Sequence, residues 1–263
     1  MENWLSSTGT KVTRLAAIDG SQLSRDDLSL LTKSFRGTGV FGPREAACYL
    51  SHREAWKYAS RQASLWTFIA EDDLHAASDF SAYLQCDAWI PRDAALVKAE
   101  TTFRRCHLGP AISMGNTRRS LHRLKSLHGG AGSYFIGRDF AAELVNRTES
   151  SWDFADFVLF DPRFHTQNTQ PRVYQIDPAP TLQDIFLPSQ GRMEASSLVP
   201  ERTINKASTS WQKLKRELTR PVRRLLSGIT ERLHAKLSGT VYRRVSFKDD
   251  EAGLWLRTGD RYQ

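Results

Sequence analysis

The sequence has few cysteines and no long hydrophobic segment. Its 263 residues include three cysteines, Cys48, Cys86 and Cys106. They are odd in number and lack the close spacing of metal ligands, so we expect reduced thiols rather than a disulfide framework. There is no run of about 18 apolar residues, and no basic segment precedes an apolar stretch near the N-terminus. We therefore expect neither a membrane-spanning helix nor a signal peptide. We expect the protein to be cytoplasmic.

The first 190 residues carry no net charge, and the positive excess of the protein lies in the remainder. Residues 1–190 contain 21 Lys and Arg against 21 Asp and Glu, whereas residues 191–263 contain 16 basic and 8 acidic residues. This split predicts two parts, a neutral globular domain over residues 1–190 and a basic, partly helical extension over residues 191–263. A basic extension of this kind is typical of a segment that meets an anionic partner.

The extension contains the pattern of an amphipathic basic helix. Between Trp211 and Leu237 the apolar residues recur mostly every three or four positions, and the arginines lie mostly elsewhere on the helical wheel. Pro221 is expected to kink or restart this helix. Such a helix either packs its apolar stripe on the core or lies on an anionic membrane surface through residues 203–237. Nucleic acid is the least favoured partner for this segment because the segment has few aromatic residues.

Strand and helix patterns alternate along the first 190 residues. Apolar segments predict strands at 12–18, 65–70, 95–100 and 133–137, and helical spacing predicts helices at 44–62 and 138–148. This alternation predicts an α/β domain with a mainly parallel or mixed sheet. In open sheets of this kind, ligands bind at the carboxyl ends of the strands.

Three consecutive acids, Glu71, Asp72 and Asp73, follow the apolar segment 65–70. Adjacent carboxylates repel one another and lose hydration at a strand end, unless they stay solvated or a cation lies among them. Many nucleotide-sugar transferases hold a divalent metal on such carboxylates, because the metal neutralises charge on the leaving nucleoside diphosphate. Taken alone, the triplet is compatible with a solvated turn as well as with a metal site.

The sequence around these acids resembles the most recognisable block of glycosyltransferase family 25, the lipopolysaccharide-biosynthesis glycosyltransferases. In that family a Gly-Glu-x-Gly-Cys-x-x-Ser-His helix precedes a strand that ends in Glu-Asp-Asp. The matching residues here are Glu45, Cys48, Ser51, His52, Glu71, Asp72 and Asp73. Further similarity lies in LVKAE (96–100), GGAGSYFIGRDFAAEL (129–144), Asp156 and the stretch from Pro180 to Gln183. The resemblance therefore spans residues 1–190.

The resemblance implies a fold and an activity. It implies a GT-A-like mixed sheet flanked by helices, here with the basic C-terminal extension added. It also implies a hexosyltransferase that moves galactose or glucose from a UDP-sugar to a lipid-linked glycan, such as lipopolysaccharide, with Mn²⁺ or Mg²⁺ as cofactor. Such an enzyme would work at the inner face of the membrane, to which the basic helix would attach it peripherally.

The same resemblance implies roles for individual residues. Asp72 and Asp73 would bind the metal, and Asp156 would be the catalytic base that takes the acceptor proton, with Asp153 competing for that role. The donor-binding residues would be Glu71, Asp72, His52 and Lys98. Trp152 and Phe154 are candidates for stacking on a sugar.

Each of these assignments has a structural alternative. A histidine such as His52, on a helix that faces the sheet, is more often a hydrogen-bonded structural residue than one that acts on substrate. Lys98 lies in an apolar segment, where it would need an anionic partner if buried or else an edge position in the sheet. Family members usually begin with a Val-Ile-Ser/Asn-Leu strand that this sequence lacks, which supports an alternative function as an inactive, transferase-like protein that binds a glycan or a partner.

Overall fold

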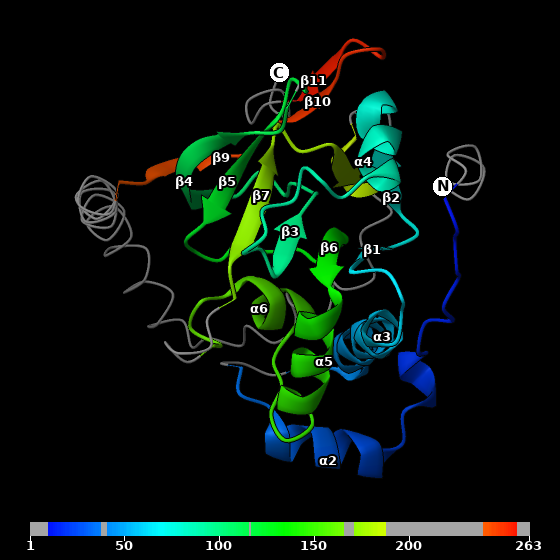
Figure 1. Ribbon diagram of the computed structural model, residues 1–263. Helices are drawn as coiled ribbons and strands as arrows, with labels where there is room; N and C mark the ends of the chain where they lie inside the picture. The colour runs from blue at the N-terminus through cyan, green and yellow to red at the C-terminus, as the bar shows by residue number, and fades with distance from the viewer. Residues whose placement is uncertain (1–9, 38–40, 116, 166–170, 188–238, 257–263) are drawn as a thin grey trace, which may run out of the picture.

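A seven-stranded mixed sheet lies at the centre of the protein (Figure 1). The computed structural model describes residues 10–37, 41–115, 117–165, 171–187 and 239–256. The helices in these ranges are η1 (Gly20–Gln22), α2 (Arg25–Ser34), α3 (Pro43–Ser60), η2 (Ser78–Phe80), α4 (Ser81–Gln85), α5 (Arg138–Arg147), α6 (Ala155–Phe160) and η4 (Asp184–Phe186). The strands are β1 (Trp66–Ala70), β2 (Leu74–Ala76), β3 (Leu96–Lys98), β4 (Arg105–Ser113), β5 (Ser120–Leu124), β6 (Ser133–Gly137), β7 (Val173–Asp177), β8 (Thr181–Gln183), β9 (Val241–Arg244), β10 (Phe247–Asp249) and β11 (Leu254–Leu256).

The sheet has the order β1-β6-β3-β7-β5-β4-β9. Strands β3 and β7 pair in parallel, and the other neighbouring pairs in this sheet are antiparallel. The expectation of a mixed α/β sheet is therefore confirmed, and its mainly parallel variant is wrong. The difference arises because β6 runs antiparallel to both of its neighbours, β1 and β3, and because β4, β5 and β9 also join the sheet as antiparallel strands.

Helices cover both faces of the sheet. On one face, residues of α3, α5 and α6 form a buried cluster with β3, β4 and β6, including Trp56, Tyr134 and Phe160. On the other face, Phe80 of η2 and Tyr83 of α4 pack against residues of β5, β6 and β7. Helices α3 and α5 lie side by side under the sheet, with α2 across their ends (Figure 1). Among the described residues, no helix is both long and apolar enough to cross a membrane.

Most of the predicted elements in the described ranges are present. The predicted helices at 44–62 and 138–148 are α3 and α5, and the strands at 65–70, 95–100 and 133–137 are β1, β3 and β6. The strand predicted at 12–18 is wrong, since this segment has no regular structure and is mostly exposed. It runs along α3 instead, where Ile18 N donates to Ser51 Oγ at 2.9 Å, so its backbone has no strand to pair with.

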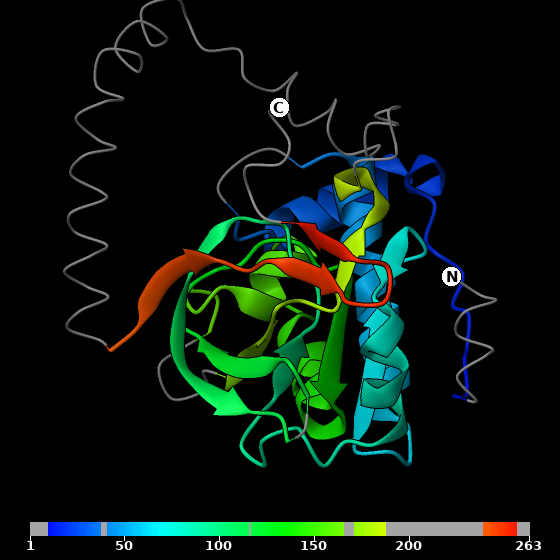
Figure 2. The same ribbon diagram turned by 90° about the horizontal axis from the view of Figure 1, so that it is seen from above.

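Residues 239–256 return to the main sheet. Strand β9 pairs with β4, and the β10–β11 hairpin follows beside it (Figure 2). The buried guanidinium of Arg119 joins the hairpin to the body, because it donates to Asp79 at 2.6 and 2.8 Å and to the carbonyl of Lys248 at 2.7 Å. The amphipathic helix predicted at 211–237 lies outside the described residues and stays a prediction, as does the domain boundary after residue 190.

Candidate active site

The strand register brings three segments of the sequence to one edge of the sheet. Ala70, the last residue of β1, pairs with Ser133, the first residue of β6. Lys98, the last residue of β3, pairs with Tyr134 on the other side of β6. The acids that follow β1, the glycine loop that precedes β6 and the residues that follow β3 therefore meet at the carboxyl ends of β1 and β3. This is the edge where open α/β sheets bind their ligands.

The acidic triplet forms a fixed turn between β1 and β2. The backbone N–H of Glu71 donates to the carbonyl of Gly132 at 2.8 Å, and that of Asp184 donates to the carbonyl of Asp73 at 2.8 Å. The side-chain amide of Gln183 donates to Glu71 Oε2 at 2.8 Å and lies 3.2 and 3.3 Å from the two carboxylate oxygens of Asp73. One amide thus holds two of the three acids, while Asp72 is exposed.

Burial and neighbouring negative charge both act on Asp73 in this turn. Burial, together with the charges of Glu71, Asp72 and Asp184, raises the pKa of Asp73 to about 6. Burial is the largest cause of this shift, and a divalent ion would relieve the part of it that comes from the neighbouring carboxylates. Carboxylate oxygens are the ligands that Mg²⁺ and Mn²⁺ prefer, and Mg²⁺ is commonly held by one or two carboxylates plus substrate phosphates. The donor set of Asp72 and Asp73 therefore fits a hard divalent cation.

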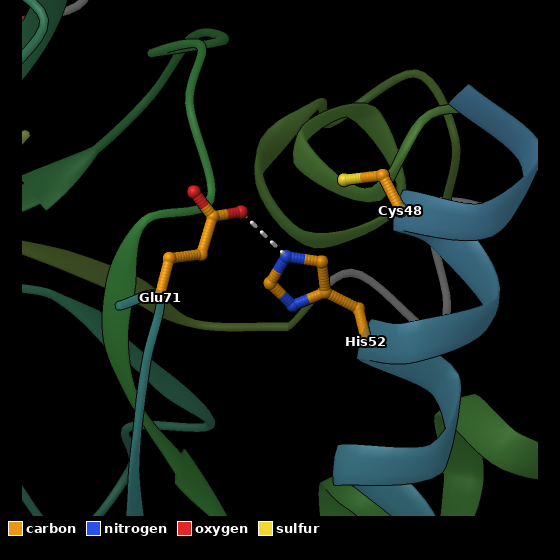
Figure 3. Close-up of side chains that lie close together, drawn as sticks. All are labelled: Cys48, His52 and Glu71. Carbon is orange, nitrogen blue, oxygen red and sulfur yellow. Dashed lines mark hydrogen bonds and ion pairs between the residues drawn. The ribbon is translucent and has the colours of Figure 1, made fainter. Parts of the chain in front are cut away.

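His52 connects α3 to this turn. Its Nε2 lies 3.2 Å from Glu71 Oε1 (Figure 3). Its Nδ1 lies 3.0 Å from the hydroxyl of Tyr134, which also accepts from Trp56 Nε1 at 2.8 Å. Burial by itself lowers the pKa of His52, but Tyr134, Cys48 and Glu71 outweigh it and raise the pKa well above its usual value. For Glu71, burial raises the pKa. The hydrogen bond and charge of His52, together with the charge of Lys98, outweigh burial, so the pKa of Glu71 is lowered overall. His52 and Glu71 therefore form a charge-assisted pair.

Lys98 and Glu100 form a second pair beneath the glycine loop. Their side chains are both fully buried, and Lys98 Nζ donates to Glu100 Oε1 at 2.8 Å. Lys98 also donates to the carbonyl of Gly130, and Glu100 Oε1 accepts from the backbone N–H of Gly132 at 2.7 Å. The pair therefore sets the path of residues 130–132. The edge position considered for Lys98 is wrong, since β3 lies between β6 and β7.

Asp156 reaches the same loop from the other side. It lies in the first turn of α6, and its Oδ2 accepts from the backbone N–H of Gly130 at 3.0 Å. A side chain on this loop would not fit, because a Cβ added at Gly130 would lie 2.8 Å from Glu100 Oε1 and one at Gly132 would lie 2.6 Å from Glu100 Oε2. The loop is thus packed between Glu100 and Asp156, and both Asp156 and Glu71 contact it, at Gly130 and Gly132.

The sequence of this body matches a known family. The profile described as glycosyltransferase family 25 (LPS biosynthesis protein) matches residues 1–159, which include the acid turn, Lys98, Glu100 and Asp156. The chain belongs to glycosyltransferase family 25. The resemblance inferred from the first block is therefore confirmed.

Three relatives of this chain are named as glycosyltransferases. The lacto-N-neotetraose biosynthesis glycosyltransferase LgtE of Neisseria meningitidis serogroup B is 30% identical over 171 residues, which cover 60% of this chain and 60% of the relative. LgtE of Neisseria gonorrhoeae is 28% identical over the same shares of both chains. LgtB of Neisseria meningitidis serogroup B is 26% identical over 150 residues, 54% of each chain. The chain thus spans about 60% or less of the length of these relatives.

The structure brings most of the predicted family 25 site residues together. Glu71, Asp73 and His52 are joined directly or through Gln183, while Lys98 and Asp156 are joined through the glycine loop. The sugar-stacking role expected for Trp152 is wrong. Its ring is buried, stacks on Tyr49 with 4.5 Å between ring centroids, and donates from Nε1 to the carbonyl of Leu31.

Sequence reasoning missed two residues that organise the site. Glu100 had a signal, because the Lys-x-Glu spacing in a strand places both side chains on one face, where a buried lysine needs a carboxylate. Gln183 had none beyond its place in the stretch that resembles the family, since its two acidic partners lie more than 100 positions away.

Proposed function

We propose that the protein transfers a hexose, galactose or glucose, from a UDP-sugar to a lipopolysaccharide or other surface-glycan acceptor. Membership of family 25 supports a glycosyltransferase, and the names of the relatives refer to oligosaccharide biosynthesis. The observation that carries the proposal is the meeting of the Glu71 to Asp73 turn and Asp156 around one glycine loop. A donor-binding group and a base are then close enough to act on the same anomeric carbon.

Asp72 and Asp73 hold Mn²⁺ or Mg²⁺ in this proposal. When bound, the ion supplies positive charge that neutralises the leaving diphosphate. Gln183 keeps Asp73 in place through its amide, and Glu71, fixed by the same amide and by His52, shapes the donor side of the turn. His52 is buried with both ring nitrogens engaged, so it acts as a positioning residue for Glu71.

Lys98 also acts through neighbours in this proposal. Its ammonium is fully buried and bonded to Glu100 and Gly130, so it positions the glycine loop along which the donor would lie. The backbone of a glycine-rich loop can approach a sugar or phosphate closely. Asp156 holds one end of that loop and is the group that accepts the proton of the acceptor hydroxyl as this attacks the anomeric carbon.

The first experiment measures UDP release from a panel of UDP-sugars, with Mn²⁺ or Mg²⁺ and then with a chelator. We expect release from one UDP-hexose that needs the metal and rises with a glycan acceptor. The Asp73→Asn variant should lose it, whereas Asp250→Asn, which changes an exposed acid in the turn between β10 and β11, should not. Full metal-dependent release by Asp73→Asn would rule out the metal assignment. Binding of glycan without release of UDP from any donor would favour the inactive, glycan-binding alternative.

Attachment to an anionic membrane through residues 203–237 is a separate part of the proposal. Removal of the whole tail is a poor test, because β9 and the β10–β11 hairpin pack on the body. A better variant changes Arg216, Arg220, Arg223 and Arg224 to Gln and leaves residues 239–256 intact. We expect wild type, but not this variant, to float with phosphatidylglycerol vesicles. Equal flotation of both would contradict the membrane role.

A further inference from the structure

Cys48, His52 and Glu71 bring three kinds of metal ligand to one point beside the acid turn. In the described part of the chain, one potential ligand atom of each lies within 4.8 Å of the other two. Cys48 and His52 are four residues apart on α3, so their side chains share one face of the helix. Glu71, at the end of β1, approaches Nε2 of His52 (Figure 3).

We propose that these three residues form a binding site for a borderline-soft divalent cation such as Zn²⁺, with water as the fourth ligand. A thiolate, an imidazole and a carboxylate are the ligands that Zn²⁺ takes, commonly three from the protein with one open position. Mg²⁺ and Mn²⁺ prefer sets of oxygen atoms. The site thus differs in chemistry from the hard-cation site assigned to Asp72 and Asp73, and it does not depend on which sugar is transferred.

The ligands are already oriented by neighbours. Tyr134 contacts Nδ1 of His52 at 3.0 Å, which leaves Nε2 facing Glu71 and the space beside Cys48. Gln183 holds the second oxygen of Glu71 at 2.8 Å, which leaves Oε1 for an ion. Outer partners of this kind fix the ring orientation of metal-binding histidines and their carboxylate neighbours. No side chain has to move far for the site to form.

The site is accessible, and binding there is a simple exchange of ions. Cys48 is half-buried and Glu71 is 31% exposed, so an ion can reach them from solvent. The ion takes the place of the proton between His52 Nε2 and Glu71 Oε1, and the thiol of Cys48 releases a second proton. Two protons leave and no electrons move. Because His52 must give up that proton and the charge-assisted bond to Glu71 is lost, we expect affinity below that of a structural four-ligand zinc site.

An ion at this position would tie the middle of α3 to the end of β1. In the described structure His52 and Glu71 are joined here by a hydrogen bond, which three metal–ligand bonds would replace. Since the folded protein assembles the ligands and the unfolded chain does not, ion binding raises the melting temperature. This gives a readout that is independent of sugar transfer.

The test uses the whole protein, stripped of metal by a chelator and kept in excess Mg²⁺ to fill the oxygen site. Zn²⁺ uptake is measured by equilibrium dialysis, and Co²⁺ is added separately as a spectroscopic probe. We expect a thiolate-to-cobalt charge-transfer band and a rise in melting temperature with Zn²⁺. Alkylation mapped by mass spectrometry should show that Zn²⁺ protects Cys48 and leaves the exposed Cys86 reactive. This last measurement needs no variant.

Matched cysteine variants separate the proposed site from other metal binding. Cys48→Ser should lose the cobalt band and at least about tenfold in Zn²⁺ affinity, the smallest loss typical of even an outer-partner change. Cys86→Ser should bind as wild type does. The buried Cys106, whose pKa burial raises to about 12, should not react in any of these proteins.

Two results would overturn the proposal. One is a wild-type protein that takes up no Zn²⁺ beyond what excess Mg²⁺ displaces. The other is uptake that Cys48→Ser leaves unchanged, or alkylation of Cys48 that Zn²⁺ does not slow. If Cys48→Ser melts well below wild type without metal, the protection of Cys48 in the wild-type protein decides the matter alone.

Discussion

Lys98 and Glu100 form an ion pair with no solvent exposure, 2.8 Å long, at the end of a central strand. Residues two apart in a strand share a face, so the pair is a local consequence of the sequence. Its burial is costly unless each charge keeps its hydrogen bonds. Gly130 supplies one to Lys98 and Gly132 one to Glu100 Oε1, whereas Glu100 Oε2 is buried without a partner. The position of the glycine loop therefore depends on this pair.

Replacing Glu100 by Gln should destabilise the protein strongly. The change keeps the shape of the side chain but leaves the ammonium of Lys98 buried without a countercharge, which costs about 3 kcal/mol or more. Urea unfolding measures this loss. The double variant Lys98→Met with Glu100→Gln removes the stranded charge and should be more stable than Glu100→Gln alone.

An exposed pair provides the control for this prediction. Lys57 and Glu54 on α3 are 2.6 Å apart, with Glu54 51% exposed. Glu54→Gln should cost less than about 1 kcal/mol. If Glu100→Gln were no more destabilising than Glu54→Gln, the buried pair would not hold the loop.

The sequence predicts well those parts of the site that depend on local order. The acids 71–73 follow β1 directly, and α3 presents His52 on its buried face, so both could be placed from helical and strand periodicity. Gln183 could not, because strand β8 reaches Asp73 only through its pairing with β2. Such pairing is a property of tertiary structure, not of any local pattern.

The same distinction holds for the fold. The segment 12–18 and β6 look alike in apolar content, yet β6 lies between two strands and the other segment lies along α3. A strand exists only where a partner offers its backbone groups. Trp152 was misplaced for a similar reason, since an aromatic residue beside an acid in the sequence gives no sign of burial against Tyr49.

Alanine at Gly132 should impair both folding and transfer. Its methyl group would lie 2.6 Å from Glu100 Oε2 and 3.1 Å from Gln183 Cγ, so the two residues that set the site would have to move. Such overpacking costs about 1–3 kcal/mol. Gly137→Ala, at the other end of β6, is the matched control, because its nearest contact would be 3.5 Å. Equal melting temperatures and equal UDP release for the two variants would contradict the tight loop.

His128 should make the protein less stable in mild acid. Its Nδ1–H donates to Gln175 Oε1 at 2.8 Å, and its Nε2 is buried without a partner. Burial, with the charges of Lys98 and Arg104, lowers its pKa from 6.5 to about 3. Below pH 6.5, His128 therefore binds a proton in the unfolded chain but stays neutral in the folded protein. The stability that the folded protein gains by keeping His128 neutral is complete above pH 6.5 and is lost as the pH falls towards 3.

The loss should reach about 2 kcal/mol between pH 7 and pH 5. The His128→Asn variant keeps a donor for Gln175 and has no proton to bind, so its unfolding free energy should fall less over the same range. Guanidinium unfolding of both proteins at the two pH values measures the difference, since all other titrating groups are common to both. Parallel losses in the two proteins would exclude His128 as the cause.

Asp156 should be needed for the chemical step more than for binding. In Asp156→Asn the amide oxygen can still accept from the backbone N–H of Gly130, so the loop keeps its position, but an amide cannot take the acceptor proton. We expect kcat to fall by about 100-fold to 10,000-fold with little change in KM for the donor.

Asp139→Asn is the matched control for this change. Asp139 is the second residue of α5, as Asp156 is of α6, and its side chain is 90% exposed. If Asp156→Asn transferred sugar as fast as Asp139→Asn, the base would have to be another acid. Asp153 would then be tested next, although one of its oxygens is already engaged by the backbone N–H of Phe154 at 2.7 Å.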